Sequence, residues 1–329
     1  MLVLIDAYSQ IFRSFFAIRR LTNSKGEPVN ALFVFTRLLL DLAKKYPSER
    51  GAMLFDCGKV EFRLKVNAEY KANRPPMPDE LKTQMPWIKE MAEAFGWPLV
   101  SHPDYEADDL AGAFARAEKS GDVRIVSSDK DLSQLVDARI KLVSPGHGNT
   151  GAFVERGERE VLEKFGVVPA LIPDYLALVG DTSDNIPGVP GIGPKGAAEL
   201  LNTCGAIETW IDDPAKIAFE KYRNKLDGQS ELLRKNLQLV RLRCELPEAL
   251  TTPATLARKA PDYAKIAELC RRFEFNRILR DLPTPPPSPA KTAEDDALPL
   301  FSAAAAAPAP STSEKKPKPE KSFEQGTLF

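Results

Sequence analysis

Acidic residues in this chain stand at positions where they could bind metal ions. Asp6, Asp56 and Asp129 each follow a short apolar run, and the segments YEADD, SSDKD and GDTSDN add Glu106, Asp108, Asp109, Asp131, Asp181 and Asp184. Two carboxylates about 4 Å apart repel each other by roughly 4 kcal/mol at an effective dielectric of ~20. Several of them in one cleft must therefore take up protons or cations.

The types of these side chains indicate which cations they would bind. Oxygen ligands without His or Cys favour Mg²⁺, or Mn²⁺, over zinc. Two such ions ~3.5 to 4 Å apart can activate water and stabilise the leaving oxygen of a phosphodiester. The acids therefore predict two-metal hydrolysis of phosphodiesters. For single residues another interpretation stays open, because aspartate is a preferred N-cap and Asp129 or Asp181 could simply begin a helix.

Basic and aromatic residues follow the same acids and could bind the phosphate and the bases of a nucleic acid. The cations are Arg13, Arg63, Lys71 and Arg74, and the interleaved aromatic residues are Tyr8, Phe62 and Tyr70. Phosphate contacts come from Lys and Arg, and aromatic rings can stack on unpaired bases. The alternative is that these cations are ordinary solvated surface residues.

The elements that must position these residues alternate between short apolar runs and longer helical patterns. The runs LVLI, AMLF and RIVSS, with helical patterns over residues 29–45 and 106–119, predict an α/β fold with a mainly parallel central sheet flanked by helices. Ligands bind outside the carboxyl ends of such strands, so Asp6, Asp56 and Asp129 should converge there. Spacings of three put Glu106 with Asp109, and Asp181 with Asp184, on common helix faces.

Two segments depart from this alternation. Residues 59–90, which contain KVEFRLKVNAEYKANRPPMP, are basic and partly aromatic without a clear periodicity, and we expect an irregular, mobile segment over the crevice. After Phe165 the pattern becomes mostly helical and contains the glycine-rich stretch GVPGIGPKG, with Gly188, Gly191, Gly193 and Lys195. No strand precedes this stretch and no Ser or Thr follows its lysine, so neither a dinucleotide-binding fingerprint nor an ATP-binding loop fits.

The glycine-rich stretch is better interpreted as a hairpin between two helices. Pro173 would start the first helix and Pro194 the second. Backbone N–H groups at the start of the second helix would then face a DNA phosphate, with Lys195 beside them. A purely structural turn is the alternative.

Composition excludes several other classes of protein. The 329 residues are 43% hydrophobic with a net charge of −1, and no apolar run reaches the ~18 residues that a membrane span needs. The N-terminus lacks the features of a secretory signal, so we expect a cytoplasmic protein. No zinc or disulfide pattern and no hydrolase nucleophile motif accompanies the cysteines and histidines, which are Cys57, Cys204, Cys244, Cys270, His102 and His147.

Several motifs together resemble the bacterial 5'-3' exonuclease family, the nuclease domain of the DNA polymerase I type that is related to flap endonucleases. The motifs are LIDAYSQIFRSFFA, GEPVNALFVFTRLL, YKANRPPMP, YEADDLAG, VSSDKDLSQLV and LVGDTSDNIPGVPGIGPKGA, between about Met1 and Leu282. The resemblance implies a PIN-like α/β nuclease core over residues 1–165, with an arch at about 59–90. It implies a helix-hairpin-helix subdomain over 166–282 that holds duplex DNA, often with K⁺.

The resemblance also implies roles for individual residues. One metal ion would be surrounded by Asp6, Asp56, Glu106 and Asp108, and the other by Asp109, Asp129, Asp131, Asp181 and Asp184. Lys71 and Arg74 would grip the scissile phosphate with help from Arg13. Contacts to DNA are expected from Tyr8, Arg63, Tyr70, Gly188, Gly191, Gly193 and Lys195. Ala7, where the family commonly has glycine, is a minor departure.

The activity that the resemblance implies is structure-selective cleavage of DNA at 5' ends and 5' flaps, in primer removal and repair, by a monomer. The alternatives are a non-catalytic binder of DNA junctions and an RNA-cleaving nuclease of the same fold. Residues 283–329 are rich in proline and alanine, and we expect them to be disordered, with no polymerase following. Within them, Gln325, Leu328 and Phe329 resemble a peptide that docks into the sliding clamp, although such short matches also arise by chance.

Overall fold

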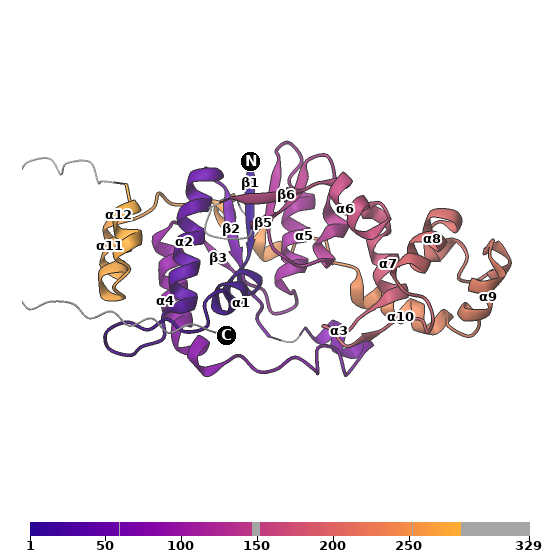
Figure 1. The fold of residues 1–329 in the computed structure, drawn as a ribbon. Coiled ribbons are helices and arrows are strands. Elements are labelled where there is room, and N and C mark those ends of the chain that lie inside the picture. Colours follow the sequence, from indigo (N-terminus) through magenta and orange to yellow (C-terminus); the bar gives the residue numbers. More distant parts are fainter. Residues whose placement is uncertain (59, 147–151, 252, 284–329) are drawn as a thin grey trace, which may run out of the picture. The chain divides into compact units, whose positions relative to one another are not determined.

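A six-stranded sheet forms the centre of the α/β part of the chain (Figure 1). The computed structural model describes residues 1–58, 60–146, 152–251 and 253–283. The strand order is β3-β2-β1-β4-β5-β6, and all neighbours pair in parallel except β6, which is antiparallel to β5. The strands are β1 (Leu2–Asp6), β2 (Gly51–Leu54), β3 (Leu99–Val100), β4 (Val123–Val126), β5 (Ile140–Pro145) and β6 (Phe153–Arg156). The prediction of a mainly parallel sheet is confirmed.

Helices cover both faces of this sheet because successive residues of each strand point to opposite sides. Leu2 and Leu4 of β1 pack into the core that contains α5 (Ala107–Ala117), whereas Val3 and Ile5 pack into a second core. The second core contains α1 (Ala7–Ala17), α2 (Asn30–Lys45), α4 (Asp79–Ala94) and α11 (Tyr263–Arg272). The helices predicted over 29–45 and 106–119 are thereby confirmed as α2 and α5.

The segment 59–90 is more regular than the sequence predicted. It holds the short helix α3 (Glu61–Val66) and most of α4, which packs against α2. Leu81, Ile88 and Met91 of α4 are completely buried. Pro78 occupies the N-cap position of α4, and Pro86 is tolerated inside the helix because apolar residues on either side of it are buried.

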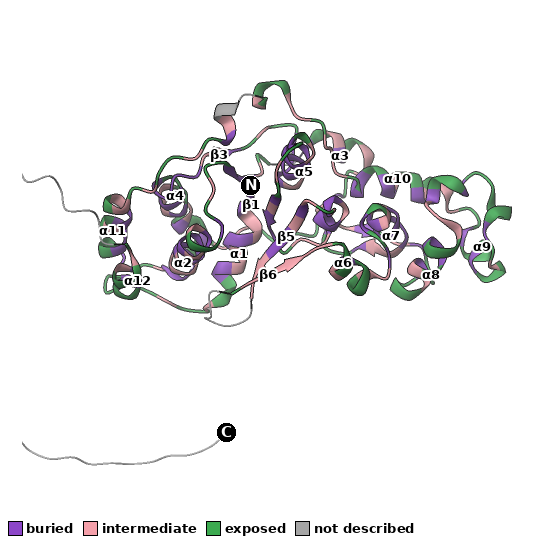
Figure 2. Cartoon of the chain, turned by 90° about the horizontal axis from the view of Figure 1, so that it is seen from above, coloured by how far each residue is buried: buried purple, intermediate pink, exposed green. Residues whose placement is uncertain are grey.

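Helices dominate the described chain from residue 158 onward, whereas the sequence predicted a mostly helical pattern only after Phe165. These are α6 (Glu158–Phe165), α7 (Ile172–Val179), α8 (Pro194–Cys204), α9 (Glu220–Leu226), α10 (Ser230–Val240), α11 and α12 (Asn276–Asp281). Figure 2 shows buried residues along α5 and α7 and mostly exposed ones on α9. Pro173 and Pro194 lie in the first turns of α7 and α8, as expected for a helix pair joined by a hairpin.

The connection from α7 to α8 corrects one expectation. Asp181 and Asp184 do not share a helix face, because Gly180–Asp181 forms the short strand β7 and pairs with β8 (Ile186–Pro187) around a tight turn. Asn185 lies in this turn with φ 58°, a left-handed conformation that asparagine tolerates better than most residues. The turn brings both carboxylates to one side.

Close packing explains the glycine at position 188. A Cβ atom there would lie 2.2 Å from the carbonyl oxygen of Val179. Asn236 of α10 holds the same region, since its side-chain amide donates to the carbonyl oxygens of Ala177 and Pro187 at 2.9 and 2.7 Å. The hairpin is therefore fixed to α7 and α10.

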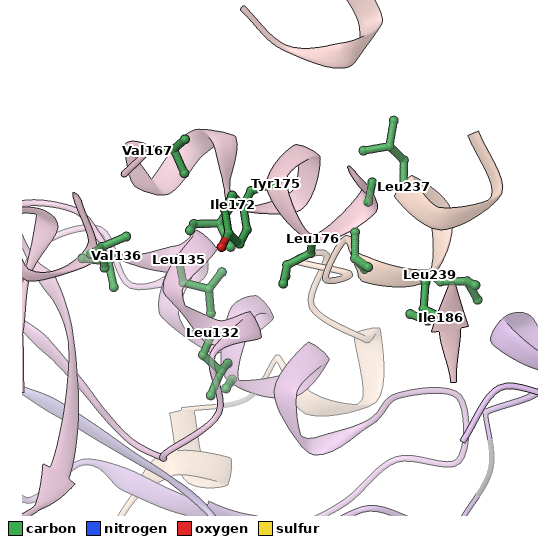
Figure 3. Packing of buried hydrophobic residues seen from close by; sticks show 14 of the residues in the cluster. Leu132, Leu135, Val136, Val167, Ile172, Tyr175, Leu176, Ile186, Leu237 and Leu239 are labelled. Carbon is green, nitrogen blue, oxygen red and sulfur yellow. The ribbon is translucent and has the colours of Figure 1, made fainter. Parts of the chain in front are cut away.

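A continuous apolar core connects the sheet to the helical part. Figure 3 shows the portion of this core around Leu132, Ile172 and Leu237. Leu132 and Leu135 belong to the 3₁₀ helix η1 (Asp131–Leu135), and they share a core with Ile172 and Leu176 of α7. Because η1 and α7 are held together, this packing fixes the distance between Asp131, at the start of η1, and the acids Asp181 and Asp184, which follow α7.

Residues 284–329 and His147 lie outside the described residues, as does the peptide containing Gln325, Leu328 and Phe329. Among the helices of the described part, none combines the length and apolar character that crossing a bilayer requires.

Candidate metal and substrate site

The carboxylates that follow the central strands meet at one edge of the sheet. Ile5 of β1 lies level with Met53 of β2 and with Val126 of β4, so Asp6, Asp56 and Asp129 leave the sheet on the same side. The edge lies where the strand order reverses, between β1 and β4. A cleft of about 440 Å³ opens there, lined by Asp6, Tyr8, Ser9, Phe12, Asp56, Gly58, Lys71, Arg74, Pro75, Glu106, Ala107, Asp108 and Asp129.

Asp6 is the most constrained acid of the cleft. It is the last residue of β1 and the N-cap of α1, where one carboxylate oxygen accepts from the backbone N–H of Ser9 at 3.1 Å. The other oxygen accepts from the Ser127 hydroxyl at 2.8 Å. Burial, with smaller contributions from the charges of Asp129 and Asp56, raises the pKa of Asp6 to about 7. A nearby cation would favour the charged form of this carboxyl.

The start of α5 contributes Glu106 and Asp108. Glu106 is the N-cap, and the backbone N–H of Ala107 donates to Asp56 at 2.7 Å, which joins the second strand to this helix. Burial raises the pKa of Asp108 well above its usual value, and the neighbouring charge of Asp109 raises it further. Negative side chains at a helix N-terminus are also favoured by the helix dipole.

A second group of acids consists of Asp131, Asp181 and Asp184. Each offers a carboxylate oxygen, and these three atoms lie within 4.8 Å of one another. Asp131 begins η1, whereas the other two flank the turn between β7 and β8. Burial raises the pKa of Asp131 well above its usual value, and the charge of Asp129 adds to the effect. Lys130 partly neutralises the group through an ion pair with Asp181 at 2.9 Å.

Lys71 and Tyr70 bridge the two groups of acids. The Tyr70 hydroxyl lies 3.1 Å from Glu106 Oε2 and 3.1 Å from Asp184 Oδ2. The Lys71 ammonium donates to Glu106 at 2.8 Å and lies 3.7 Å from Asp184. Arg74 pairs with the other oxygen of Asp184 at 2.5 Å. Although burial opposes the change, Lys71 and Arg74 lower the pKa of Asp184 below its usual value.

Backbone contacts fix this bridge in place. The N–H of Lys71 donates to the carbonyl oxygen of Asp184 at 3.0 Å, and the Asn73 side chain donates to that of Thr182 at 2.6 Å. In return, the Asn185 side chain donates to the carbonyl oxygen of Glu69 at 2.8 Å. Lys71 has φ 54°, which is an unfavourable backbone conformation for a residue with a long side chain. Such strained conformations cluster at functional sites.

The donor set fits divalent cations. All the candidate ligands are carboxylates, which are the ligands that Mg²⁺ and Mn²⁺ prefer. One buried oxygen of Asp131 has no hydrogen-bond partner, so it is free to coordinate an ion. Asp6, Asp108, Asp129 and Asp131 all have raised pKa values because burial disfavours their charges, and a cation would offset that cost.

The structure contradicts two of the predicted contacts to DNA. The Arg63 side chain is 1% exposed and pairs with Glu106 and Asp109. Tyr70 is 5% exposed and its hydroxyl is used by the two acids described above. In this structure the polar atoms of both side chains make contacts inside the protein instead of facing a nucleic acid. Tyr8 does line the cleft, next to Phe12 at a ring distance of 6.3 Å.

Two further expectations differ from the structure. Arg13 does not meet the acids: its guanidinium donates to the carbonyl oxygens of Pro145 and Gly146 at 3.2 and 3.4 Å, in a separate pocket. Asp109 lies with Glu106 and Asp108 rather than with Asp131 and the β7–β8 turn, so the structure does not bring it together with the acids expected to share its ion. Gly191, Gly193 and Lys195 are exposed at the hairpin, whereas Gly188 is partly buried.

Sequence reasoning missed Ser9, Ser127 and Lys130, which position or neutralise the acids. Ser127 stands in the same SSDKD segment as Asp129 and Asp131. Lys130 lies between these two acids, so a basic residue inside an acidic motif was an available signal. Ser9 stands three residues after Asp6, the spacing at which an N-cap side chain accepts from the backbone.

Comparisons with known proteins agree with this geometry. A family model for the 5'-3' exonuclease N-terminal resolvase-like domain matches residues 1–166, and one for the 5'-3' exonuclease C-terminal SAM fold matches residues 167–264. A 5'-3' exonuclease from Aquifex aeolicus is 38% identical over 284 residues, which cover 85% of this chain and 94% of that protein. DNA polymerase I from Pseudomonas aeruginosa is 45% identical over 290 residues, which cover 85% of this chain and 31% of the polymerase.

A solved structure shares the fold. The bacteriophage T5 flap endonuclease, in a pseudo-enzyme-product complex with DNA and metal ions, superposes with a TM-score of 0.59 at 26% identity. The match covers 83% of this chain and 99% of the T5 protein. The two family models together span residues 1–264, and the match to the Aquifex aeolicus exonuclease covers most of both chains. The chain therefore belongs to the 5'-3' exonuclease family.

Proposed function

We propose that this chain hydrolyses DNA at 5' ends and 5' flaps with the help of two divalent ions, Mg²⁺ in the first place and Mn²⁺ as a substitute. One observation carries the proposal: acids at the end of β1, after β2 and β4, at the starts of α5 and η1, and in the β7–β8 turn gather in one region around Lys71. Such a convergence from distant parts of the chain is not needed for stability, because like charges repel.

The acids divide naturally between two ions. One ion would be held by Asp6, Asp56, Glu106 and Asp108, and the other by Asp129, Asp131, Asp181 and Asp184. When bound, the pair would supply Lewis acidity at the phosphate and lower the pKa of an attacking water. Asp129 suits a place between the groups, because it lines the cleft and its pKa is raised by burial and by the charges of Asp184 and Asp181.

The cations of the bridge would hold the substrate phosphate. Lys71 and Arg74 line the cleft, and both now neutralise Asp184. Divalent ions bound to the acids would weaken that pairing, which would leave the two side chains to bind the scissile phosphate. Tyr8 and Phe12, on the same wall of the cleft, would stack on an unpaired base.

The hairpin between α7 and α8 would hold the duplex, as part of a DNA-binding unit over 166–282. Gly193 is the N-cap of α8, and Lys195 stands exposed in its first turn, which suits contact with a phosphate. A monovalent cation such as K⁺ at this hairpin belongs to the proposal. One carbonyl oxygen of the hairpin, that of Gly191, accepts from the Lys225 ammonium at 2.7 Å, so K⁺ would have to bind beside or displace this ammonium.

Cleavage of a labelled 5'-flap oligonucleotide tests this function. We expect cleavage with Mg²⁺, none after chelation by EDTA, and little on a matched 3'-flap substrate. The products should be sized, and the assay repeated with an RNA flap and with K⁺ replaced by Na⁺. Persistent cutting in excess EDTA would contradict the two-metal mechanism. Tight flap binding without cleavage in Mg²⁺ or Mn²⁺ would instead favour a non-catalytic junction binder, and preference for RNA an RNA-cleaving nuclease.

We also propose that the peptide with Gln325, Leu328 and Phe329 binds a sliding clamp. The support is the sequence QGTLF, and a tether would raise the concentration of the nuclease at the clamp. Deleting residues 325–329 should remove binding to an immobilised clamp while leaving cleavage of short flaps unchanged. Equal clamp binding by the deleted and the full chain would discard this part of the proposal.

A further inference from the structure

We propose that Arg63 and Asp109 form a buried ion pair that positions Glu106, and that Asp109 ligates neither metal ion. This inference rests on the proposed two-metal function. It also separates Asp109 from its neighbours in the sequence, because Glu106 and Asp108 line the cleft whereas Asp109 does not. Proximity alone would group all three acids as ligands.

Every nitrogen of the Arg63 guanidinium is engaged inside the protein. Nη1 donates to Asp109 Oδ2 at 2.6 Å and to Glu106 Oε2 at 3.0 Å, and Nη2 donates to Asp109 Oδ1 at 2.7 Å. Nε donates to the carbonyl oxygen of Leu239 at 3.2 Å. Two parallel bonds between a guanidinium and one carboxylate give strong geometric specificity.

The carboxylate of Asp109 has no lone pair left for a metal ion. Besides the two bonds from Arg63, Oδ1 accepts from the backbone N–H of Arg243 at 2.9 Å and Oδ2 from that of Glu106 at 3.2 Å. Four donors saturate the roughly four lone-pair positions of a carboxylate. Asp131 is the opposite case, since one of its buried oxygens has no partner.

The same contacts explain how the pair acts on the site. Arg63 comes from α3, Asp109 from α5, and Leu239 from α10, so the pair joins three helices at the N-terminus of α5. Glu106 receives donors from Arg63, Tyr70 and Lys71 on a single oxygen, Oε2. These contacts therefore set the direction of the Glu106 carboxylate before any ion binds. Arg63 thus acts as a positioning residue.

The test compares single and double variants. Removing one partner leaves the other charge buried and unpaired, so Arg63→Met and Asp109→Asn should each lower the melting temperature. The double variant Arg63→Met with Asp109→Asn removes both charges, and we expect its melting temperature to exceed that of Arg63→Met. The double variant should bind two Mn²⁺ ions per chain in a direct titration and cleave about tenfold more slowly, as loss of a supporting contact does.

Asp108→Asn provides the matched control. Asp108 lies next to Asp109 in the sequence but lines the cleft, so this variant should keep its fold, lose the tight binding of one Mn²⁺ and cleave roughly a thousandfold more slowly. The inference is overturned if the folded double variant binds only one Mn²⁺ or loses as much cleavage as Asp108→Asn. Failure of the unaltered chain to bind Mn²⁺ or to cleave would refute the proposed function instead.

A conservative variant covers the case in which the double variant does not fold. Arg63→Lys keeps the charge but loses the two parallel bonds. We expect a lower melting temperature, an unchanged Mn²⁺ stoichiometry of two, and a fall in kcat with little change in KM, because Glu106 moves while the DNA contacts stay. Loss of one Mn²⁺ in Arg63→Lys, or a change confined to KM, would contradict the positioning role.

Discussion

Replacing Asp129 and Asp131 together by asparagine should abolish cleavage while leaving flap binding largely intact. Asparagine keeps the size of both side chains and removes two of the charges that would hold the second ion. Loss of an ion costs several kcal/mol of stabilisation of the transition state, and each ~1.4 kcal/mol is a factor of ten, so the rate should fall roughly a thousandfold or more. Single-turnover cleavage and a binding titration of the same flap substrate measure the two quantities separately.

Binding should survive because its expected contacts lie elsewhere. Lys71, Arg74 and the exposed Lys195 remain, and removing two negative charges lowers the repulsion of a DNA phosphate. Asp122→Asn is the control: this acid pairs at 3.4 Å with Arg124, its side chain is 59% exposed, and its loss should change neither quantity. Cleavage by the double variant within tenfold of the unaltered chain would rule out these two acids as ligands.

Divalent cations should stabilise the fold more strongly at pH 8 than at pH 6. The pKa of Asp6 is raised to about 7 from an ordinary value of 3.8, so the folded chain binds this proton more tightly than the unfolded chain does. That contribution is fully present below about pH 4 and is lost as the pH rises through 7. The raised pKa values of Asp108, Asp129 and Asp131 act in the same direction.

A cation replaces the proton, so it competes with protons at low pH and relieves repulsion at high pH. At pH 8, Mn²⁺ about 100-fold above its dissociation constant should raise the melting temperature by roughly 5 °C or more, and at pH 6 by clearly less. Thermal melts of the metal-free and Mn²⁺-loaded chain at the two values measure this. Asp6→Asn should reduce the difference between them, and an equal gain at both pH values would refute the linkage.

The sequence allowed a good part of the site to be predicted because strand ends obey a simple rule. Asp6, Asp56 and Asp129 each follow an apolar run, and parallel strands of one sheet present their carboxyl ends at the same edge. The 3.6-residue periodicity likewise identified α2 and α5. These features depend on residues close together in the sequence, so local patterns contain the information.

Burial of polar side chains could not be predicted in the same way. An arginine such as Arg63 is expected at the surface. Contacts with Asp109, 46 residues later in the sequence, and with the carbonyl oxygen of Leu239 remove its side chain from solvent. Tyr70 was similarly expected at the surface, but Asp184, 114 residues later, takes its hydroxyl. Helix α4, in the segment predicted to be irregular, was missed for a related reason, since it packs against α2, which is distant in the sequence.

The contacts that bind residues 69–74 to the β7–β8 turn have a consequence for biosynthesis. A nascent polypeptide that has emerged only through β6 already carries Asp6, Asp56, Glu106 and Asp129, yet it lacks Asp181, Asp184 and the backbone carbonyl that receives the Lys71 N–H. The proposed ion-binding pocket would stay half built until the β7–β8 turn, which follows α7, has left the ribosome. Such an order of assembly would leave the proposed cutting centre incomplete while the polypeptide is still being made.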